Sequence, residues 1–434
     1  MTSRTQKNIK VENKHPTVGL VNLGCVRNTV DSQDILGRLE RKGHRIVDPD
    51  KAEVVVVNTC SFIEDARKES VDAIMDLVRL KKQGRVKKII VAGCLAQRYG
   101  SKLSKELPEV DAFVGVQSLK KDHGQEALSL TPSHYAYLKI CESCFNRCSF
   151  CVIPLLKGRF ASRSVESILK DVRRMDARGV KEINIVGQDI TAYGMDLFRE
   201  KRLAGLLRRI AVECSAIGWI RLLYAYPSHV TDELLEVIAS EPKICKYIDI
   251  PLQHVSDRVL KAMRRRITRA QTARLVERIR RKVPGVFLRT TFIVGFPGET
   301  EREFSELLDF VREYRFERVG VFPYSREEGT AAWGLPGQVP LKTKRARQRR
   351  LMEDQQEISR AFLESQLGRE LRVLVEGRAP DTKDVYQARS EFDAPDVDGM
   401  VYVRSVQPLR AGQFAEVRIT GALDYDLEGE LVRC

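Results

Sequence analysis

Four cysteines on one short stretch offer ligands for a metal centre. Cys144, Cys148 and Cys151 follow a C-x3-C-x2-C spacing directly after an apolar run, residues 136–140, that is typical of a strand. Thiolates on one tight loop can hold an iron–sulfur cluster, and three ligands leave one of four irons open to another molecule. The alternative is a structural zinc site, which Cys141 could close as a fourth ligand. The spacing favours the open cluster.

Three further cysteines, Cys25, Cys60 and Cys94, occupy equivalent places in the first hundred residues. Each follows an apolar run and precedes a helix-like stretch. The carboxyl ends of parallel strands lie at one edge of a sheet, where ligands bind, and helix N-termini there favour the thiolate. We therefore predict that these three cysteines converge on a second open cluster. The alternative is that one or two of them are simply buried cysteines.

Apolar runs that alternate with helical patterns must position this second set. The strand-like runs are residues 17–23, 52–57, 88–92 and 112–116, and the helix-like stretches include residues 32–42 and 66–81. Such alternation predicts an α/β domain with an open parallel sheet and helices on both faces. We predict that this N-terminal domain spans residues 16–124 and follows a disordered basic tail, residues 1–15.

The same alternation resumes after a connector, residues 120–133. Six strand-like runs follow, at residues 136–140, 182–187, 220–226, 247–252, 287–294 and 318–324. Six βα repeats are too many for a small sheet and too few for an eight-fold barrel. We therefore predict a partial six-stranded (βα) barrel over residues 134–366, with functional residues at the strand ends. A basic run, residues 342–350, is interpreted as a solvent-exposed helix face.

The last part of the chain, residues 367–434, has a different pattern. Short strand-like runs at residues 371–375, 399–404, 415–420 and 429–432 predict a small all-β barrel. The whole chain has a net charge of +15, but this part has nine Lys or Arg and thirteen Asp or Glu. It therefore carries −4, and the rest of the chain carries +19. A module that binds nucleic acid should be basic, so the acidic charge favours a basic protein as partner.

The composition is that of a globular protein of a reducing compartment. Hydrophobic residues make up 43% of the chain, and no apolar run approaches the length of a membrane span. The first residues are polar and basic without the apolar core of a secretory signal, so we expect a cytoplasmic protein. Ten cysteines in such a chain are more typical of metal binding or chemistry than of a disulfide framework.

Several motifs together resemble a known family. The triad Cys144, Cys148 and Cys151 resembles the cluster loop of radical S-adenosylmethionine (SAM) enzymes. Further segments resemble the methylthiotransferase branch of these enzymes and its C-terminal TRAM domain: residues 58–63, 92–99, 187–189, 295–300, 393–399 and 420–427. The resemblance covers about residues 17–431. In the cluster loop, Ser143 stands where a glycine is usual and Cys141 where another residue is usual, and neither change removes a ligand.

The resemblance implies two [4Fe–4S] clusters and SAM as cofactors. The cluster on the first cysteine triad would cleave SAM to a 5′-deoxyadenosyl radical, which removes hydrogen from the β-carbon of an aspartate in ribosomal protein S12. The cluster on Cys25, Cys60 and Cys94 would supply a methylated sulfur, with a second SAM as methyl donor. Radical chemistry of this kind belongs to the cofactor, so we predict no catalytic residue beyond the cluster ligands.

The resemblance also suggests which residues line the SAM pocket. We expect them to be Phe150, Gln188, Gln253, Gly295 and Glu299. Phe150 lies between two cluster ligands and is expected near the adenine. The other four residues follow strand-like runs, where glycines allow the backbone to approach a ligand closely.

The implied partners are a basic ribosomal protein and an electron donor. The first is ribosomal protein S12, either free or assembled in the small subunit, and the second is a low-potential donor such as flavodoxin or ferredoxin. We expect no contact with a membrane. Two alternatives stay open: a tRNA adenosine methylthiotransferase, which the charge of +19 favours, and a non-catalytic iron–sulfur or zinc protein. We interpret Cys141 as a bystander.

Overall fold

The computed structural model describes residues 15–116 and 129–434, which form two compact units that divide near residues 117–131. The predicted basic tail lies outside the described residues apart from His15, and so does most of the predicted connector. No helix in the described ranges is long and apolar enough to cross a membrane.

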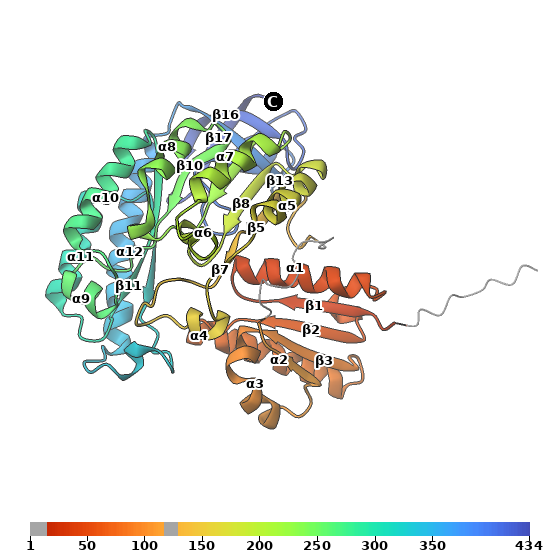
Figure 1. Cartoon of the computed structure of the whole chain (residues 1–434). Helices are drawn as coiled ribbons and strands as arrows, with labels where there is room; N and C mark the ends of the chain where they lie inside the picture. The colour runs from red at the N-terminus through yellow and green to blue at the C-terminus, as the bar shows by residue number, and fades with distance from the viewer. Residues whose placement is uncertain (1–14, 117–128) are drawn as a thin grey trace, which may run out of the picture. The chain divides into compact units, whose positions relative to one another are not determined.

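The first unit is an open four-stranded parallel sheet, as predicted (Figure 1). Its strands lie in the order β1-β2-β3-β4, and its three main helices follow the first three strands. The bounds are β1 Val18–Asn22, α1 Val26–Arg41, β2 Val54–Thr59, α2 Glu64–Lys82, β3 Lys88–Gly93, α3 Cys94–Glu106 and β4 Ala112–Val114. β2 is buried along its whole length, because Val54 and Val56 pack toward α1 and Val55 and Val57 toward α2.

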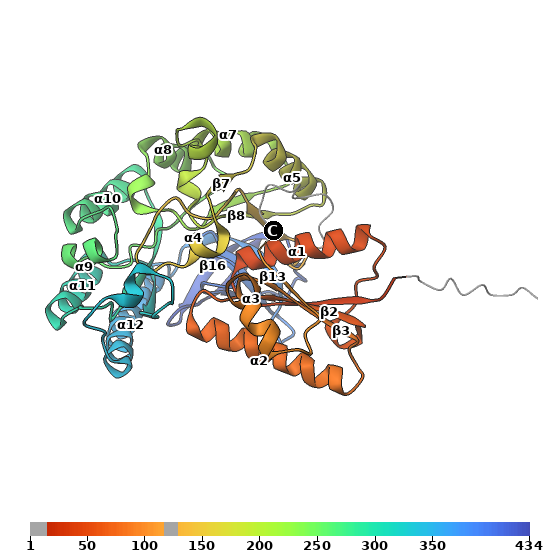
Figure 2. The ribbon, with the colours of Figure 1, turned by 60° about the horizontal axis from the view of Figure 1, so that its bottom comes forward.

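The second unit contains the predicted partial six-stranded barrel. All neighbouring strands are parallel, in the order β12-β11-β10-β9-β8-β5. Helices cover the convex face of the sheet and form an arc around it (Figure 2). The strands are β5 Tyr135–Lys139, β8 Glu182–Val186, β9 Trp219–Leu222, β10 Ile244–Asp249, β11 Phe287–Val294 and β12 Arg318–Pro323. The main helices are α5 Val165–Ala177, α7 Leu203–Glu213, α8 Asp232–Ser240, α10 Arg269–Lys282, α11 Glu301–Tyr314 and α12 Leu341–Glu364.

The end of the chain closes into the predicted all-β barrel within the same unit. Its five strands are β13 Glu370–Arg378, β14 Val385–Ser390, β15 Val401–Arg404, β16 Phe414–Ala422 and β17 Leu427–Arg433, in the order β13-β14-β15-β17-β16. The sequence pattern misses β14. In this strand Tyr386 and Ala388 face the small core, whereas Arg389 and Ser390 are buried against the parallel sheet and are polar.

An acidic segment, residues 393–398, holds the small barrel against the concave face of the parallel sheet. The hydroxyl of Tyr137 donates to the Asp396 carboxylate at 3.2 Å, and that of Tyr247 donates to Asp398 at 2.7 Å. Arg289 also pairs with Asp398, at 3.4 Å. These carboxylates contribute to the acidic charge that favoured a basic partner, but in the structure they bind groups of their own chain.

A buried network of alternating charges strengthens this contact. The carboxylate of Glu182 is fully buried between Arg221, at 2.8 Å, and Arg389, at 2.6 Å. Burial alone would raise the pKa of Glu182, but the two arginines outweigh it and lower the pKa. Because the folded value lies below the unfolded one, this contribution to stability is present above about pH 4.3 and is lost as the pH falls through the folded value.

Removing that carboxylate should destabilise the second unit strongly. We expect Glu182→Ala to cost about 3–5 kcal/mol, because two buried guanidinium groups lose their shared partner. Urea unfolding followed by far-ultraviolet circular dichroism measures the loss. The control is Glu370→Ala, which removes an exposed pair with Arg418 and should cost less than about 1 kcal/mol. Equal losses of unfolding free energy in the two variants would contradict the stabilising role of the buried Glu182 carboxylate.

Candidate metal centres

The first cysteine triad lies on a loop beyond the carboxyl end of β5. This loop connects β6 (Cys141–Glu142) with α4 (Ile153–Lys157), and Cys144, Cys148 and Cys151 are each half-buried on it. A turn brings the backbone N–H of Cys151 to the carbonyl of Cys148 at 3.2 Å. All three thiols therefore lie at the edge of the sheet where ligands of parallel α/β proteins bind.

Ser143 occupies a backbone position that favours glycine. Its φ of 66° lies in the left-handed region, which costs an L-residue about 1–2 kcal/mol. The Ser143 hydroxyl donates to the carbonyl of Gly158 at 2.6 Å, and this bond offsets part of the cost. The loop conformation thus explains why a glycine suits this position and how a serine is accommodated.

Nitrogen donors face the sulfurs of Cys144 and Cys148. The Asn146 backbone N and Nδ2 lie 3.4 Å and 3.5 Å from the Sγ of Cys144, and Arg265 Nη1 lies 3.6 Å from the Sγ of Cys148. Burial, together with the nearby carboxylate of Asp189, raises the pKa of the Cys144 thiol to about 11. Ligation must therefore displace a proton from Cys144, and donors of this kind stabilise the resulting thiolate.

Cys141 has a different environment from its three neighbours. Its side chain is fully buried, and its Sγ donates to the carbonyl of Asp189 at 3.5 Å. A Cβ on Gly187 would lie 2.5 Å from this sulfur, so the chain encloses it closely. Burial raises the pKa of the Cys141 thiol well above its usual value. A buried, protonated thiol of this kind is chemically inert.

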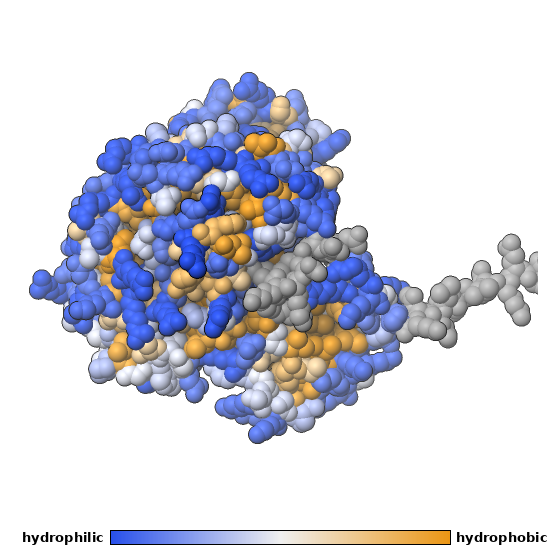
Figure 3. Space-filling model, in the orientation of Figure 1, coloured by the Kyte–Doolittle hydropathy of each residue, from blue (hydrophilic) through white to orange (hydrophobic). Residues whose placement is uncertain are grey.

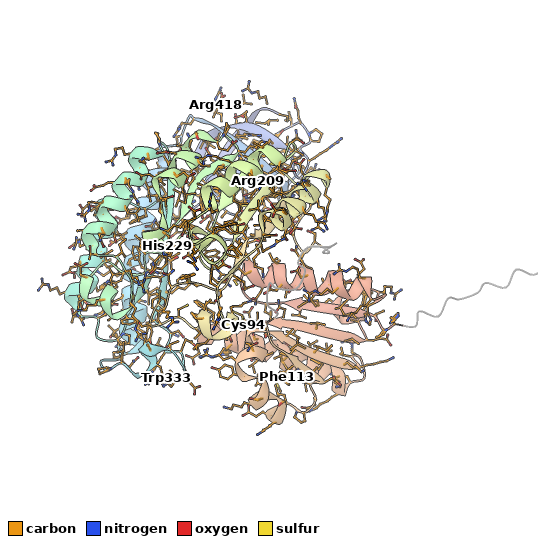
Figure 4. The ribbon with its side chains drawn as sticks, viewed as in Figure 1. Cys94, Phe113, Arg209, His229, Trp333 and Arg418 are labelled. Atoms are coloured by element: carbon orange, nitrogen blue, oxygen red, sulfur yellow. The ribbon has the colours of Figure 1, made fainter. Side chains whose placement is uncertain are left out.

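The second triad lies at the carboxyl edge of the first unit's sheet. Cys60 and Cys94 directly follow the paired residues Thr59 and Gly93, and Cys25 is the N-cap of α1 (Figure 4 labels Cys94). A Cβ on Gly24 would lie 2.6 Å from the Cβ of Cys60, so only glycine lets the two loops approach this closely.

The surroundings of Cys25 favour the thiolate form of its side chain. Burial alone would raise its pKa, but the charge of Arg27 and the N–H of Asn28 outweigh it and lower the pKa. The thiolate is the form that binds metal. Each triad thus supplies three cysteine sulfurs at a sheet edge, with donors or a positive charge beside at least one of them.

The donor set suits clusters better than single ions. In the described part of the chain, no three His, Cys, Asp or Glu side chains are arranged to bind one metal ion. In an iron–sulfur cluster each thiolate ligates a different iron, so the sulfurs need not surround a single ion. Hydrogen bonds to the ligand sulfurs are also typical of such clusters.

The side-chain amide of Gln188 is held in place by one hydrogen bond, and its oxygen can accept another. Its Nε2 donates to Glu142 Oε1 at 2.8 Å, and its Oε1 is buried with no hydrogen-bond donor among the described residues. Burial would raise the pKa of Glu142, but Lys139 and Lys157 outweigh it and lower the pKa to about 2. The ionised carboxylate therefore holds the Gln188 amide in place, and Oε1 is available to a ligand with an N–H or O–H group.

The other residues predicted for the SAM pocket lie in or beside the loops after β10 and β11. Gln253, with a φ of 76°, bridges to β11 through its backbone, and Phe150 packs against a small cluster that includes Phe296. The Glu299 carboxylate accepts from the N–H groups of Gly295, at 2.8 Å, and Phe296, at 3.1 Å. Within the chain, Glu299 therefore fixes the loop, and its contact with SAM stays a prediction.

The basic run of residues 342–350 is only partly the exposed helix face that we predicted. Lys344 and Arg347 are buried on α12. Lys344 Nζ donates to the carbonyl of Tyr324 at 2.8 Å, and Arg347 Nη1 donates to Glu299 Oε1 at 2.9 Å. The prediction was wrong for these two residues because the helix packs its basic side chains against the carboxylate and carbonyl groups of the loops.

Gly295 makes room for this packing, which gives a testable prediction. A Cβ at this position would overlap with the Cγ of Lys344, and its φ is 71°. We compare Gly295→Ala with Gly285→Ala, whose φ is 76° but where a Cβ meets nothing within 4 Å. Both substitutions carry the left-handed cost, and Gly295→Ala should cost about 1–3 kcal/mol more in urea unfolding. Adding Lys344→Ala to Gly295→Ala should recover part of this difference. Equal costs for the two glycine variants would contradict the steric explanation.

The structure gives contacts to Asp189, which belongs to the segment 187–189 noted in the sequence, and adds two residues that sequence reasoning missed, His229 and Arg265. The buried carboxylate of Asp189 accepts from Asn146 Nδ2 at 2.9 Å and from Thr191 at 2.6 Å. His229 Nδ1 lies 2.9 Å from the same carboxylate (Figure 4 labels His229). Arg265 reaches the cluster loop from the segment after α9 (Asp257–Ala262). No spacing in the sequence connects these residues with the cysteines.

Three family models match the chain. They are the uncharacterized protein family UPF0004 at residues 17–115, the radical SAM superfamily at residues 138–311 and the TRAM domain at residues 367–432. The structure of the radical SAM methyltransferase TsrM from Kitasatospora setae is similar with a TM-score of 0.52. It is 15% identical and the match covers 73% of this chain and 74% of that chain, so the likeness shows the fold.

Curated relatives match almost from end to end. The ribosomal protein uS12 methylthiotransferase RimO of Thermoanaerobacter sp. is 46% identical over 95% of this chain and 99% of the relative. The protein of the same name from Pelotomaculum thermopropionicum is 47% identical over 96% and 99%, and that from Geobacter sulfurreducens is 44% identical over 97% and 100%.

Proposed function

The chain belongs to the RimO family of radical SAM methylthiotransferases, and we propose that it adds a methylthio group to the β-carbon of an aspartate in ribosomal protein uS12. One observation supports this most strongly. Two separate cysteine triads each lie at the carboxyl edge of a parallel sheet in the same chain. A methylthio transfer needs two kinds of chemistry, a radical at carbon and a source of sulfur, and two triads offer a site for each.

The residues divide between these two tasks. A [4Fe–4S] cluster on Cys144, Cys148 and Cys151 would supply an open iron for SAM and the electron that yields the 5′-deoxyadenosyl radical. Beside this loop, Gln188 offers an Oε1 that accepts no hydrogen bond from a described residue, and the glycine turn after β11 brings backbone close to the same edge. We propose that Cys25, Cys60 and Cys94 hold the second [4Fe–4S] cluster, on which the transferred sulfur is carried.

Charge supports a protein substrate. The all-β barrel carries −4, and Glu428 and Glu430 of β17 remain exposed although other carboxylates bind within the chain. Figure 3 shows hydrophilic side chains over most of one face, interrupted by separate apolar patches. A basic ribosomal protein would meet acidic groups on the barrel, in the cytoplasm where such proteins are made. The electron would come from a low-potential donor such as flavodoxin or ferredoxin.

Mass spectrometry of uS12 tests the proposal. Cells with the gene should show uS12 heavier by one methylthio group, and cells without it should not. The purified holoenzyme with SAM and a reductant should add the same mass to isolated uS12 or to uS12 in the small subunit, and the comparison shows which form is the substrate. If the mass of uS12 stayed unchanged both in cells and with the purified holoenzyme, uS12 would not be the substrate.

A tRNA adenosine methylthiotransferase is the second candidate, because residues 1–366 carry +19. If bare tRNA were the substrate, its binding should weaken steeply as salt rises, since released counterions supply the affinity. Iron analysis separates both enzymes from a zinc protein. Two cubane clusters predict about eight irons per chain, and zinc in place of iron would exclude the radical mechanism.

A further inference from the structure

Arg265 is held beside the first cysteine triad from three sides. Its side chain is buried, and Nη1 lies 3.6 Å from the Sγ of Cys148. Nη2 donates to the carbonyl of Pro251 at 2.6 Å, and the guanidinium lies 4.1 Å from the ring centre of Tyr226. A guanidinium fixed by a short hydrogen bond and a cation–π contact keeps its charge at one place relative to the sulfur.

The sulfur of Cys144, by contrast, faces neutral donors. Cys144 accepts from the backbone N and Nδ2 of Asn146, and the Asn146 amide is fixed by the carboxylate of Asp189. That carboxylate also faces His229 and Thr191. The environment is therefore asymmetric, with a full positive charge at Cys148 and a neutral amide backed by a carboxylate at Cys144.

We propose that Arg265 tunes the reduction potential of the group held by Cys144, Cys148 and Cys151, making it easier to reduce. The inference rests on the proposed function, since it assumes an iron–sulfur cluster on these thiolates. One electron taken from an external one-electron reductant adds a unit of negative charge there, with no bond made or broken at Arg265. A buried positive charge beside Cys148 stabilises the more negative state, because charges interact strongly in a low-dielectric site.

The test is a redox titration of the full-length holoprotein, followed by electron paramagnetic resonance. Cys25, Cys60 and Cys94 are replaced by alanine in every sample, so that the first triad alone contributes a signal. Arg265→Met removes the charge and the donor, and Arg265→Lys keeps the charge. Arg266→Met is the matched control, because it removes the same charge from the exposed neighbouring residue.

At a fixed potential, Arg265→Met should lower the ratio of reduced to oxidised cluster about tenfold, which is about 59 mV for a one-electron couple. Arg265→Lys should fall between Arg265→Met and the parent, and Arg266→Met should match the parent. A ratio in Arg265→Met within twofold of that in Arg266→Met, with iron content unchanged, would overturn the proposal. Loss of iron from both Arg265 variants would also overturn it, since Arg265 would then be needed to build the site. A parent protein without any cluster signal would refute the proposed function itself.

Discussion

Cys144→Ala should abolish SAM cleavage, whereas Cys141→Ala should leave it nearly intact. The two cysteines are only three residues apart, Cys141 in β6 and Cys144 on the loop that follows, but their sulfurs differ in environment. The Cys144 sulfur is half-buried and accepts from Asn146, while the Cys141 sulfur is enclosed and donates to the carbonyl of Asp189. The release of 5′-deoxyadenosine from SAM in the presence of dithionite measures the activity.

Iron content provides the second measurement for this pair. The parent should hold about eight irons per chain, Cys144→Ala about four and Cys141→Ala about eight. The Cys141 substitution removes a fully buried sulfur and leaves a small cavity, so it should cost about 0.5–3 kcal/mol in stability while the fold is retained. Loss of SAM cleavage in Cys141→Ala, with the fold retained, would show that Cys141 takes part at the metal centre.

The repeated elements of the fold could be predicted because their sequence patterns are local. In β2, four consecutive valines predict a strand buried on both faces, and the structure confirms it. The strand β14 was missed because its second buried face is not apolar. Arg389 on that strand finds its partners, Glu182 and Glu376, in other strands, and the sequence pattern carries no signal of such a pairing.

The candidate ligands could be proposed from the sequence for the same reason, and their role as ligands stays a prediction, whereas their surroundings could not be foreseen. The spacing of Cys144, Cys148 and Cys151 is a local signal. Arg265 contacts Cys148 from 117 residues away, and His229 contacts Asp189 from 40 residues away, so only the folded chain brings them there. Charge counting had a similar limit. It registered Asp396 and Asp398 as acidic surface, whereas the fold places them against Tyr137 and Tyr247 of the parallel sheet.

Cys60→Ala should separate the two halves of the reaction. If Cys25, Cys60 and Cys94 serve the sulfur and the other triad serves the radical, this variant should still release 5′-deoxyadenosine but should leave uS12 without a methylthio group. Its iron content should fall to about four per chain. Ser61→Ala is the control, because it removes a neighbouring buried hydroxyl that has no hydrogen-bond partner among the described residues.

Comparing Cys60→Ala with Ser61→Ala shows whether the two cysteine triads act independently of each other. The two triads lie on different sheets in different compact units, so a substitution at Cys60 should not disturb the hydrogen bonds from Asn146 and Arg265 to the other triad. Anaerobic assays on one preparation give both products, 5′-deoxyadenosine and the mass of uS12. If Cys60→Ala lost SAM cleavage while Ser61→Ala kept it, the two triads would depend on each other. If Cys60→Ala still modified uS12, the sulfur would have to reach the aspartate without the second cluster.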